Sequence, residues 1–175
     1  MARTLPLATR KDYEALPEGA PYELHDGILV KQAAPRYGHQ RCLRSIQRAL
    51  VEHVGWERVA TSPVDCLIDE INVFQPDLVV FGEKPEDLPE DDDQYIRTPR
   101  IVVEALSLST AGRDRGYKAR RYLGIGVKEV WLLDWHRQTI EVIDFNGSRI
   151  HEADDPARSD ALPGFRITPV ALYTG

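Results

Sequence analysis

The sequence predicts an α/β fold, in which a mixed β-sheet is flanked by helices. A strand–helix–strand unit is indicated by a near-continuous apolar run at 101–106, a helical stretch at 110–124 and a second apolar run at 130–133. Such a unit joins parallel strands. Asp26-Gly27 and Asn146-Gly147 each lie between short strand-like segments and favour tight hairpins, which join antiparallel strands. Both kinds of pairing together indicate a mixed sheet.

Length and composition bound the class of protein. The chain has 175 residues, of which 42% are hydrophobic and 29% charged, so one soluble domain over 1–175 is expected, with an N-terminal arm and short helix at 1–20. No apolar run exceeds four residues, whereas a membrane span needs roughly 20, and the N-terminus lacks a signal-peptide core. Cys42 and Cys66 fit neither a disulfide framework nor a zinc site. We therefore expect a cytoplasmic protein with free thiols and no membrane partner.

The net charge of −6 hides an uneven distribution. The segment 83–93 holds seven acids and one lysine, which predicts an exposed acidic loop over about 82–98. The segment 31–48 holds five basic residues and no acid, and 97–121 holds seven basic residues against two acids. Such segments can bind a polyanion locally, or they can be solvated helix faces.

The remaining elements follow from local signals. Thr9 caps a short helix over 10–16, and apolar residues at helical spacing predict a long helix over about 38–54. We expect Ser109 or Thr110 to cap the later helix, and Gly124 and Gly126 to end it. The expected strands, in chain order, are 22–25 and 28–30 in one hairpin, 58–68 and 73–81 in a second, 101–106, 130–133, 139–145 and 149–151.

Two acids occupy unusual positions in apolar strands. Asp77 opens the run Leu78–Phe81, and Glu104 lies within 101–106. A lone buried carboxylate costs several kcal/mol unless it is paired or binds a metal. Neighbouring strands would bring both carboxylates within reach of one hard cation such as Mg²⁺. The alternative is that Asp77 caps a strand end and Glu104 pairs with an arginine.

Lys118 lies in the helix that follows the Glu104 strand, so it can lean over the end of that strand. There it could polarise water or stabilise phosphoryl charge, although most lysines are simply solvated. Tyr122, four residues later, lies on the same helix face, where it is either a second polar contact or part of the core.

Several segments, taken in order, resemble a known family. They are Tyr22–Gly27, Pro76–Val80, Val103–Ser107, Ser109-Thr110, Asp114-Arg115, Lys118, Gly126–Asp134 and Leu162–Phe165. From about 13 to 165 the chain resembles the Uma-type family of restriction-endonuclease-like proteins, within the PD-(D/E)XK nuclease superfamily. Two positions depart from the pattern: Leu106 stands where the superfamily carries its lysine, and Leu108 replaces a usual proline.

The resemblance implies a metal-dependent DNA endonuclease. Asp77 and Glu104 match the magnesium ligands, with manganese as a possible substitute. Glu23 matches an early glutamate that helps to hold metal or orient water, and Lys118 matches a lysine displaced onto the helix. His39 resembles a histidine at the edge of the site. The basic residues expected on backbone phosphates are Arg36, Arg41, Arg113, Arg115 and Arg121.

Other candidates have simpler interpretations. We expect His25, beside a turn, to face solvent, and Ser107 and Ser109 to serve in caps and turns because no histidine–acid pair accompanies them. All three tryptophans are expected in the core. By analogy with related nucleases, we expect a homo-oligomer. The alternative function is a non-catalytic module of the same fold that binds nucleic acid or a protein.

Overall fold

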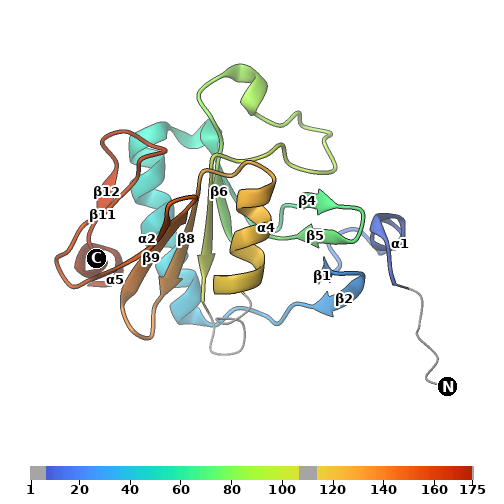
Figure 1. The fold of residues 1–175 in the computed structure, drawn as a ribbon, viewed down its shortest axis with the longest axis horizontal. Coiled ribbons are helices and arrows are strands. Elements are labelled where there is room, and N and C mark those ends of the chain that lie inside the picture. Colours follow the sequence, from blue (N-terminus) through green and yellow to red (C-terminus); the bar gives the residue numbers. More distant parts are fainter. Residues whose placement is uncertain (1–6, 107–113, 175) are drawn as a thin grey trace.

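A six-stranded mixed sheet forms the centre of the computed structural model, which describes residues 7–106 and 114–174 (Figure 1). The strand order is β10-β9-β8-β7-β6-β3, and only β7 and β8 pair in parallel. The strands are β3 (Val59–Thr61), β6 (Leu78–Val80), β7 (Ile101–Ala105), β8 (Glu129–Asp134), β9 (Thr139–Asp144) and β10 (Gly147–Glu152). This arrangement confirms the predicted α/β class, the parallel strand–helix–strand unit and the turn at Asn146-Gly147.

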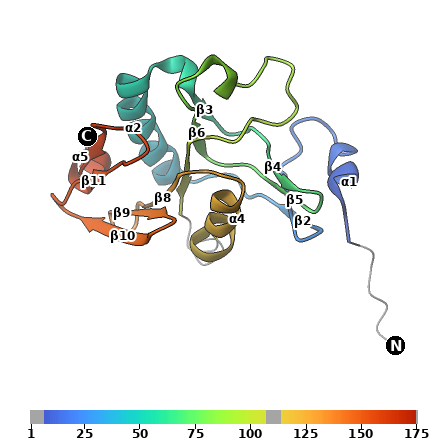
Figure 2. The same cartoon turned by 45° about the horizontal axis from the view of Figure 1, so that its top comes forward.

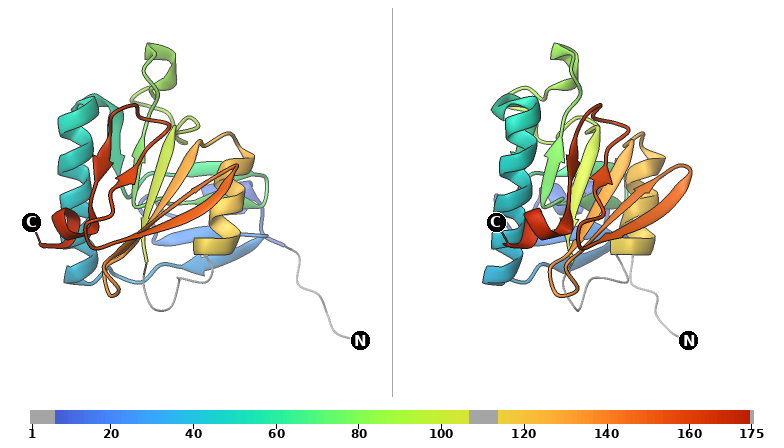
Figure 3. Two further views of the ribbon diagram at one scale, coloured as in Figure 1. Left: turned by 60° about the vertical axis from the view of Figure 1, so that its left-hand side comes forward. Right: turned by 90° about the vertical axis from the view of Figure 1, so that its left-hand side faces the viewer.

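Helices cover both faces of this sheet (Figure 3). On one face lie α2 (Tyr37–Val54) and α5 (Pro169–Thr174), and on the other lies α4 (Ala119–Gly124). Because side chains alternate along a strand, β7 sends Val103 towards α2 and Val102 towards α4. Two short strands, β11 (Ala157–Arg158) and β12 (Arg166–Ile167), complete the α2 side.

A second, four-stranded antiparallel sheet lies beside the first, in the order β2-β1-β5-β4 (Figures 1 and 2). Its strands are β1 (Tyr22–His25), β2 (Ile28–Lys31), β4 (Cys66–Asp69) and β5 (Asn72–Phe74). The pairing of β1 with β2 confirms the hairpin predicted at Asp26-Gly27. The short helix α1 (Arg10–Glu14) packs Tyr13 against this sheet, and it ends earlier than the predicted residue 16.

The two segments of the predicted hairpin, 58–68 and 73–81, do pair antiparallel with each other, but the pairing is divided between the two sheets. The segments form two antiparallel pairs in different sheets: β3 with β6 in the large sheet, and β4 with β5 in the small one. Pro63 and Pro76 lie where the chain crosses between the sheets. Proline has no N–H to donate to a strand ladder, so each interrupts the pairing there. The second crossing places Asp77 at the start of β6, at the boundary between the sheets.

The connections between these elements are mostly exposed. A 3-10 turn, η1 (Trp56–Arg58), follows α2, and the acidic loop at 82–98 contains another, η2 (Pro85–Asp87). The helix before β8 begins with a π-helical turn, η3 (Asp114–Lys118), and the caps predicted at Ser109 or Thr110 lie outside the described residues. Both cysteines are buried and unbonded to each other. Among the described helices, none has the length and apolar character that crossing a membrane requires.

Candidate active site

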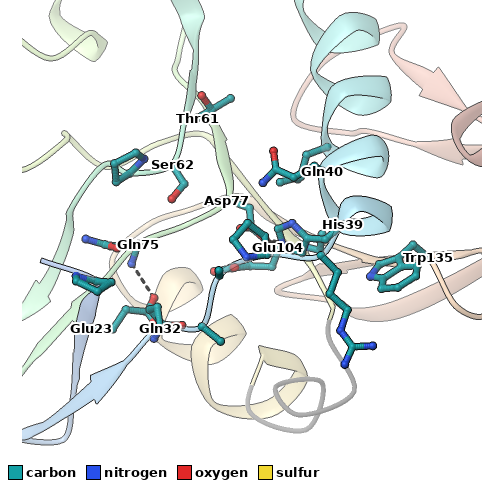
Figure 4. A pocket seen from close by; sticks show the side chains of 18 of the residues that line it. Glu23, Gln32, His39, Gln40, Thr61, Ser62, Gln75, Asp77, Glu104 and Trp135 are labelled. Atoms are coloured by element: carbon teal, nitrogen blue, oxygen red, sulfur yellow. Dashed lines mark hydrogen bonds and ion pairs between the residues drawn. The ribbon is translucent and has the colours of Figure 1, made fainter. Parts of the chain in front are cut away.

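A cavity of about 910 Å³ opens where the first turns of α2 meet the boundary between the two sheets (Figure 4). The strands β1, β3 and β7, the residue before β6 and the turn after β8 contribute to its wall. Four residues predicted to act in a site line it together, although they come from distant parts of the chain: Glu23, Asp77, Glu104 and Lys118. The residues at its edge include His39.

Asp77 and Glu104 meet because of the sheet register. Leu78 pairs with Val103 in the antiparallel β6–β7 ladder. Asp77, which precedes Leu78, therefore lies opposite Glu104, which follows Val103. The Asp77 carboxylate accepts a hydrogen bond from the backbone N–H of Ala105, with Oδ2 at 2.8 Å from the nitrogen. His39 Nε2 lies 3.1 Å from the same oxygen. Both contacts fix the orientation of the Asp77 carboxylate.

Lys118 reaches this place from η3. Its Nζ lies 2.6 Å from Glu104 Oε1 and 3.0 Å from Glu23 Oε1, and all three side chains are only 5–7% exposed. We call Glu23, Glu104 and Lys118 the buried wall. The Tyr122 hydroxyl, fully buried, donates to Glu104 Oε1 over 2.9 Å. The buried wall therefore satisfies the rule that buried charges are paired and hydrogen-bonded.

Glu23 is ionised in this setting. Burial raises the pKa of its carboxyl, but the Lys118 ammonium and hydrogen bonds from His25 and the Gln75 backbone outweigh burial and lower the pKa to about 2. The donor–acceptor distances are 2.7 Å from Gln75 N to Oε1 and 2.9 Å between His25 Nε2 and Oε2. Gln32 Nε2 also donates to Oε2 over 2.7 Å. Glu23 is thus a fixed anion with few degrees of freedom.

The expectation that His25 faces solvent was wrong. Its side chain is buried and stacks on Phe74, with ring centroids 4.8 Å apart. The turn at Asp26-Gly27 left this unclear, because a strand residue beside a turn can point to either face. Neither Gln32 nor Gln75 was singled out from the sequence, since their importance comes only from their contacts with Glu23.

The predicted phosphate-binding arginines are not gathered in one place. Arg36 lines the cavity, whereas Arg41, on the same helix, is exposed outside its wall. Arg121 pairs instead with Asp26 and Asp69 of the small sheet, at 2.5 and 3.2 Å. Arg113 lies outside the described residues, as does the side chain of Arg115. Arg44, which the sequence did not single out, lines the cavity two turns after Arg36.

One tryptophan lies in the core, a second is half-buried and packs against it, and the third is exposed. Trp131 is 1% exposed in β8, but Trp56 is 70% exposed and Trp135 lines the cavity. Trp56 and Trp135 lie in turns at the ends of regular elements, where no strand or helix pattern determines whether a side chain points inward. Burial there depends on neighbouring elements.

The carboxylates fit a hard divalent cation. Mg²⁺ needs only one or two protein carboxylates and fills its remaining positions with water and phosphate oxygens. Asp77 and Glu104 supply such a pair beside an open cavity. Across residues 7–106 and 114–174, no three His, Cys, Asp or Glu side chains form a cluster suited to a metal. A cation held by Asp77 and Glu104 would therefore take its remaining ligands from water or substrate.

Comparison with known proteins identifies the family and a shared fold. The model of the family described as "Uma2: Putative restriction endonuclease" matches residues 10–171. The chain belongs to the Uma2 family. Its fold is shared with a crystal structure titled as a putative nuclease belonging to DUF820, from Anabaena variabilis ATCC 29413, with a TM-score of 0.82 and 18% identity. That match covers 95% of this chain and 97% of the other. No curated protein matches this Uma2 chain.

Proposed function

We propose that this Uma2 protein is a divalent-metal-dependent endonuclease that hydrolyses phosphodiester bonds in DNA. The observation that carries the proposal is the convergence of Asp77 and Glu104 from adjacent strands, with Lys118 Nζ 2.6 Å from Glu104, at one cavity. Membership of a restriction-endonuclease family supports it, since such families generally use divalent metals.

The three residues have distinct roles in this proposal. Asp77 and Glu104 would hold Mg²⁺, or Mn²⁺ in its place. When bound, such a cation neutralises charge on the phosphodiester and lowers the pKa of water. Lys118 can donate a hydrogen bond to the attacking water or to a phosphoryl oxygen. Hydrolysis then forms a P–O bond to the water oxygen and breaks the P–O bond to the leaving sugar oxygen.

The other cavity residues would support these groups. Glu23 provides a second carboxylate contact to the Lys118 ammonium besides Glu104, which restrains the position of the amine. His39 orients Asp77 through its 3.1 Å contact. Tyr122 orients Glu104 from the buried side. Arg36 faces the cavity from the start of α2, where a substrate phosphate could reach it.

The test is cleavage of plasmid and single-stranded DNA in Mg²⁺ and in Mn²⁺. We expect Glu104→Gln and Lys118→Met to lower the rate by about 100-fold or more, since each removes a group that acts on the transition-state charge. Glu152→Gln and Lys128→Met are matched controls, because both residues are exposed and outside the cavity wall. Circular dichroism would establish that each variant folds.

Two results would contradict the proposal. Equal cleavage by the wild type and by folded Glu104→Gln would assign the activity to a contaminant. Salt-sensitive DNA binding without cleavage in either metal would support the non-catalytic module instead. Cytoplasmic location and homo-oligomerisation remain predictions, and light scattering would measure the latter.

A further inference from the structure

The cavity wall on the α2 side differs in chemistry from the buried wall. It consists of polar and basic side chains along α2 and two aromatic rings from the turn after β8, all lining the cavity. We call this set the exposed wall: Arg36, Gln40, Arg44, Gln47, Trp135 and His136. Figure 4 shows Trp135 on one side of His39, with Glu23 and Gln75 on the other.

The helical part of this wall forms a single stripe. Arg36, Gln40 and Arg44 follow one another at four-residue intervals, so they lie on one side of the helix. All three are exposed. With a rise of 1.5 Å per residue, the two arginines are about 12 Å apart along the axis, far enough to contact different phosphates of one strand. The stripe borders His39, which contacts Asp77.

The aromatic part is held rigidly against this stripe. The rings of Trp135 and His136 lie with centroids 3.6 Å apart and planes 32° from parallel. Trp135 also packs on the first turn of α2: a Cβ added to Gly38 would lie 2.6 Å from its Cε3 and Cζ3 atoms. His136 is exposed. Fixed aromatic rings beside a basic stripe are the features that proteins use to bind unpaired strands.

We infer that the exposed wall binds an unpaired DNA strand, which makes single-stranded DNA the substrate of the proposed nuclease. Arg36 and Arg44 contact backbone phosphates, and a base stacks on the exposed His136 ring, which Trp135 supports from beneath. This inference rests on the proposed function and names its substrate class. Bases within a duplex are already stacked and paired, so they cannot reach these rings without opening the helix.

Charge also favours a single strand. The protein carries a net charge of −6, and Arg41 and Arg121 lie outside the cavity wall. Broad phosphate contacts over a duplex would bring a long polyanion against a protein of net negative charge. A single strand that follows the exposed wall gains affinity from base stacking, so it needs few cationic contacts.

The experiment compares binding of a labelled mixed-sequence oligonucleotide and of its blunt duplex, by fluorescence anisotropy in EDTA so that no cleavage occurs. We expect the single strand to bind at least about tenfold more tightly. His136→Ala and Trp135→Leu should each weaken single-strand binding by about 5- to 100-fold, the range for loss of one stacked base, and Trp135→Phe should retain most of it. Trp56→Leu is the matched control, since Trp56 is exposed outside the cavity.

A second substrate separates stacking from a general loss of structure. An oligonucleotide with abasic residues should bind the wild type weakly, and His136→Ala should weaken it no further. Equal or tighter binding of the duplex, with no effect of the ring variants, would overturn this inference while Mg²⁺-dependent cleavage still supported the nuclease. Absence of both DNA binding and cleavage would instead overturn the proposed function and this inference together.

Discussion

The two walls of the cavity hold their charges in opposite ways. In the buried wall, Lys118 lies between two carboxylates, and these side chains are almost fully removed from water. In the exposed wall, Arg36 and Arg44 remain solvated. Charges taken out of water must be paired by the fold itself, so their geometry is established before any ligand binds. Charges left in water contribute little to stability and remain accessible to a ligand.

The comparison predicts that the largest effect on stability comes from Lys118→Met. This change leaves Glu23 and Glu104 buried without their cation, and we expect the free energy of unfolding to fall by about 3–5 kcal/mol. Urea denaturation at pH 7 measures it. The double variant Glu104→Gln/Lys118→Met removes one carboxylate charge as well and should recover part of the loss. A loss below about 1 kcal/mol in the single variant would show that the buried wall is not desolvated as described.

The pH dependence of stability tests whether the fold holds Glu23 as an anion. The pKa of Glu23 is about 2 in the folded protein against 4.5 for the ordinary carboxyl, so the unfolded state binds its proton more readily. Its contribution to stability is therefore complete above about pH 4.5 and is lost as the pH falls towards 2. Between pH 4.5 and 2, we expect the free energy of unfolding to fall less steeply with falling pH in Glu23→Gln than in the wild type. Parallel curves for the two proteins would contradict the low pKa.

Gly38→Ala tests the contact that joins α2 to the exposed wall. Alanine gains helix propensity of about 1 kcal/mol, but its Cβ would meet the Trp135 ring at 2.6 Å. Crowding a rigid ring costs about 1–3 kcal/mol, so we expect a modest net loss of stability and a changed Trp135 fluorescence. Thermal unfolding gives the stability. Gly116→Ala is the control, because no atom lies within 4 Å of its added Cβ.

Arg44→Gln has the smallest expected effect on stability. The side chain is exposed, and its contact with the Tyr37 ring, 5.6 Å from the guanidinium carbon to the centroid, is solvated. We expect a change within about 0.5 kcal/mol. Single-strand affinity should instead become less salt-dependent, with the slope of log K against log salt falling by about 0.7. The control is Arg41→Gln, which lies outside the cavity wall and should leave the slope unchanged. Equal changes of slope in the Arg41 and Arg44 variants would show that Arg44 has no special role in binding the strand.

Local patterns predicted much of the fold and the chemical identity of the site candidates. The Asp26-Gly27 and Asn146-Gly147 turns and the long helix at 37–54 depend on neighbouring residues in the chain, so they can be recognised from sequence. The parallel pairing of β7 with β8 follows from a buried strand, a helix and a second buried strand in succession. Asp77 and Glu104 are recognisable because the first opens an apolar run and the second interrupts one.

Local sequence patterns therefore account for most of the elements, the mixed sheet and the unusual acids. Tertiary structure alone decided that the segment 58–81 divides between two sheets, that His25 is buried, and that Trp135 joins Arg44 at the cavity. It also decided that Arg121 pairs with the small sheet while Lys118, three residues earlier, reaches Glu104. The physical reason is that strand partners, burial and ion pairs depend on residues far away in the chain, whereas turns and helical periodicity depend on residues close by.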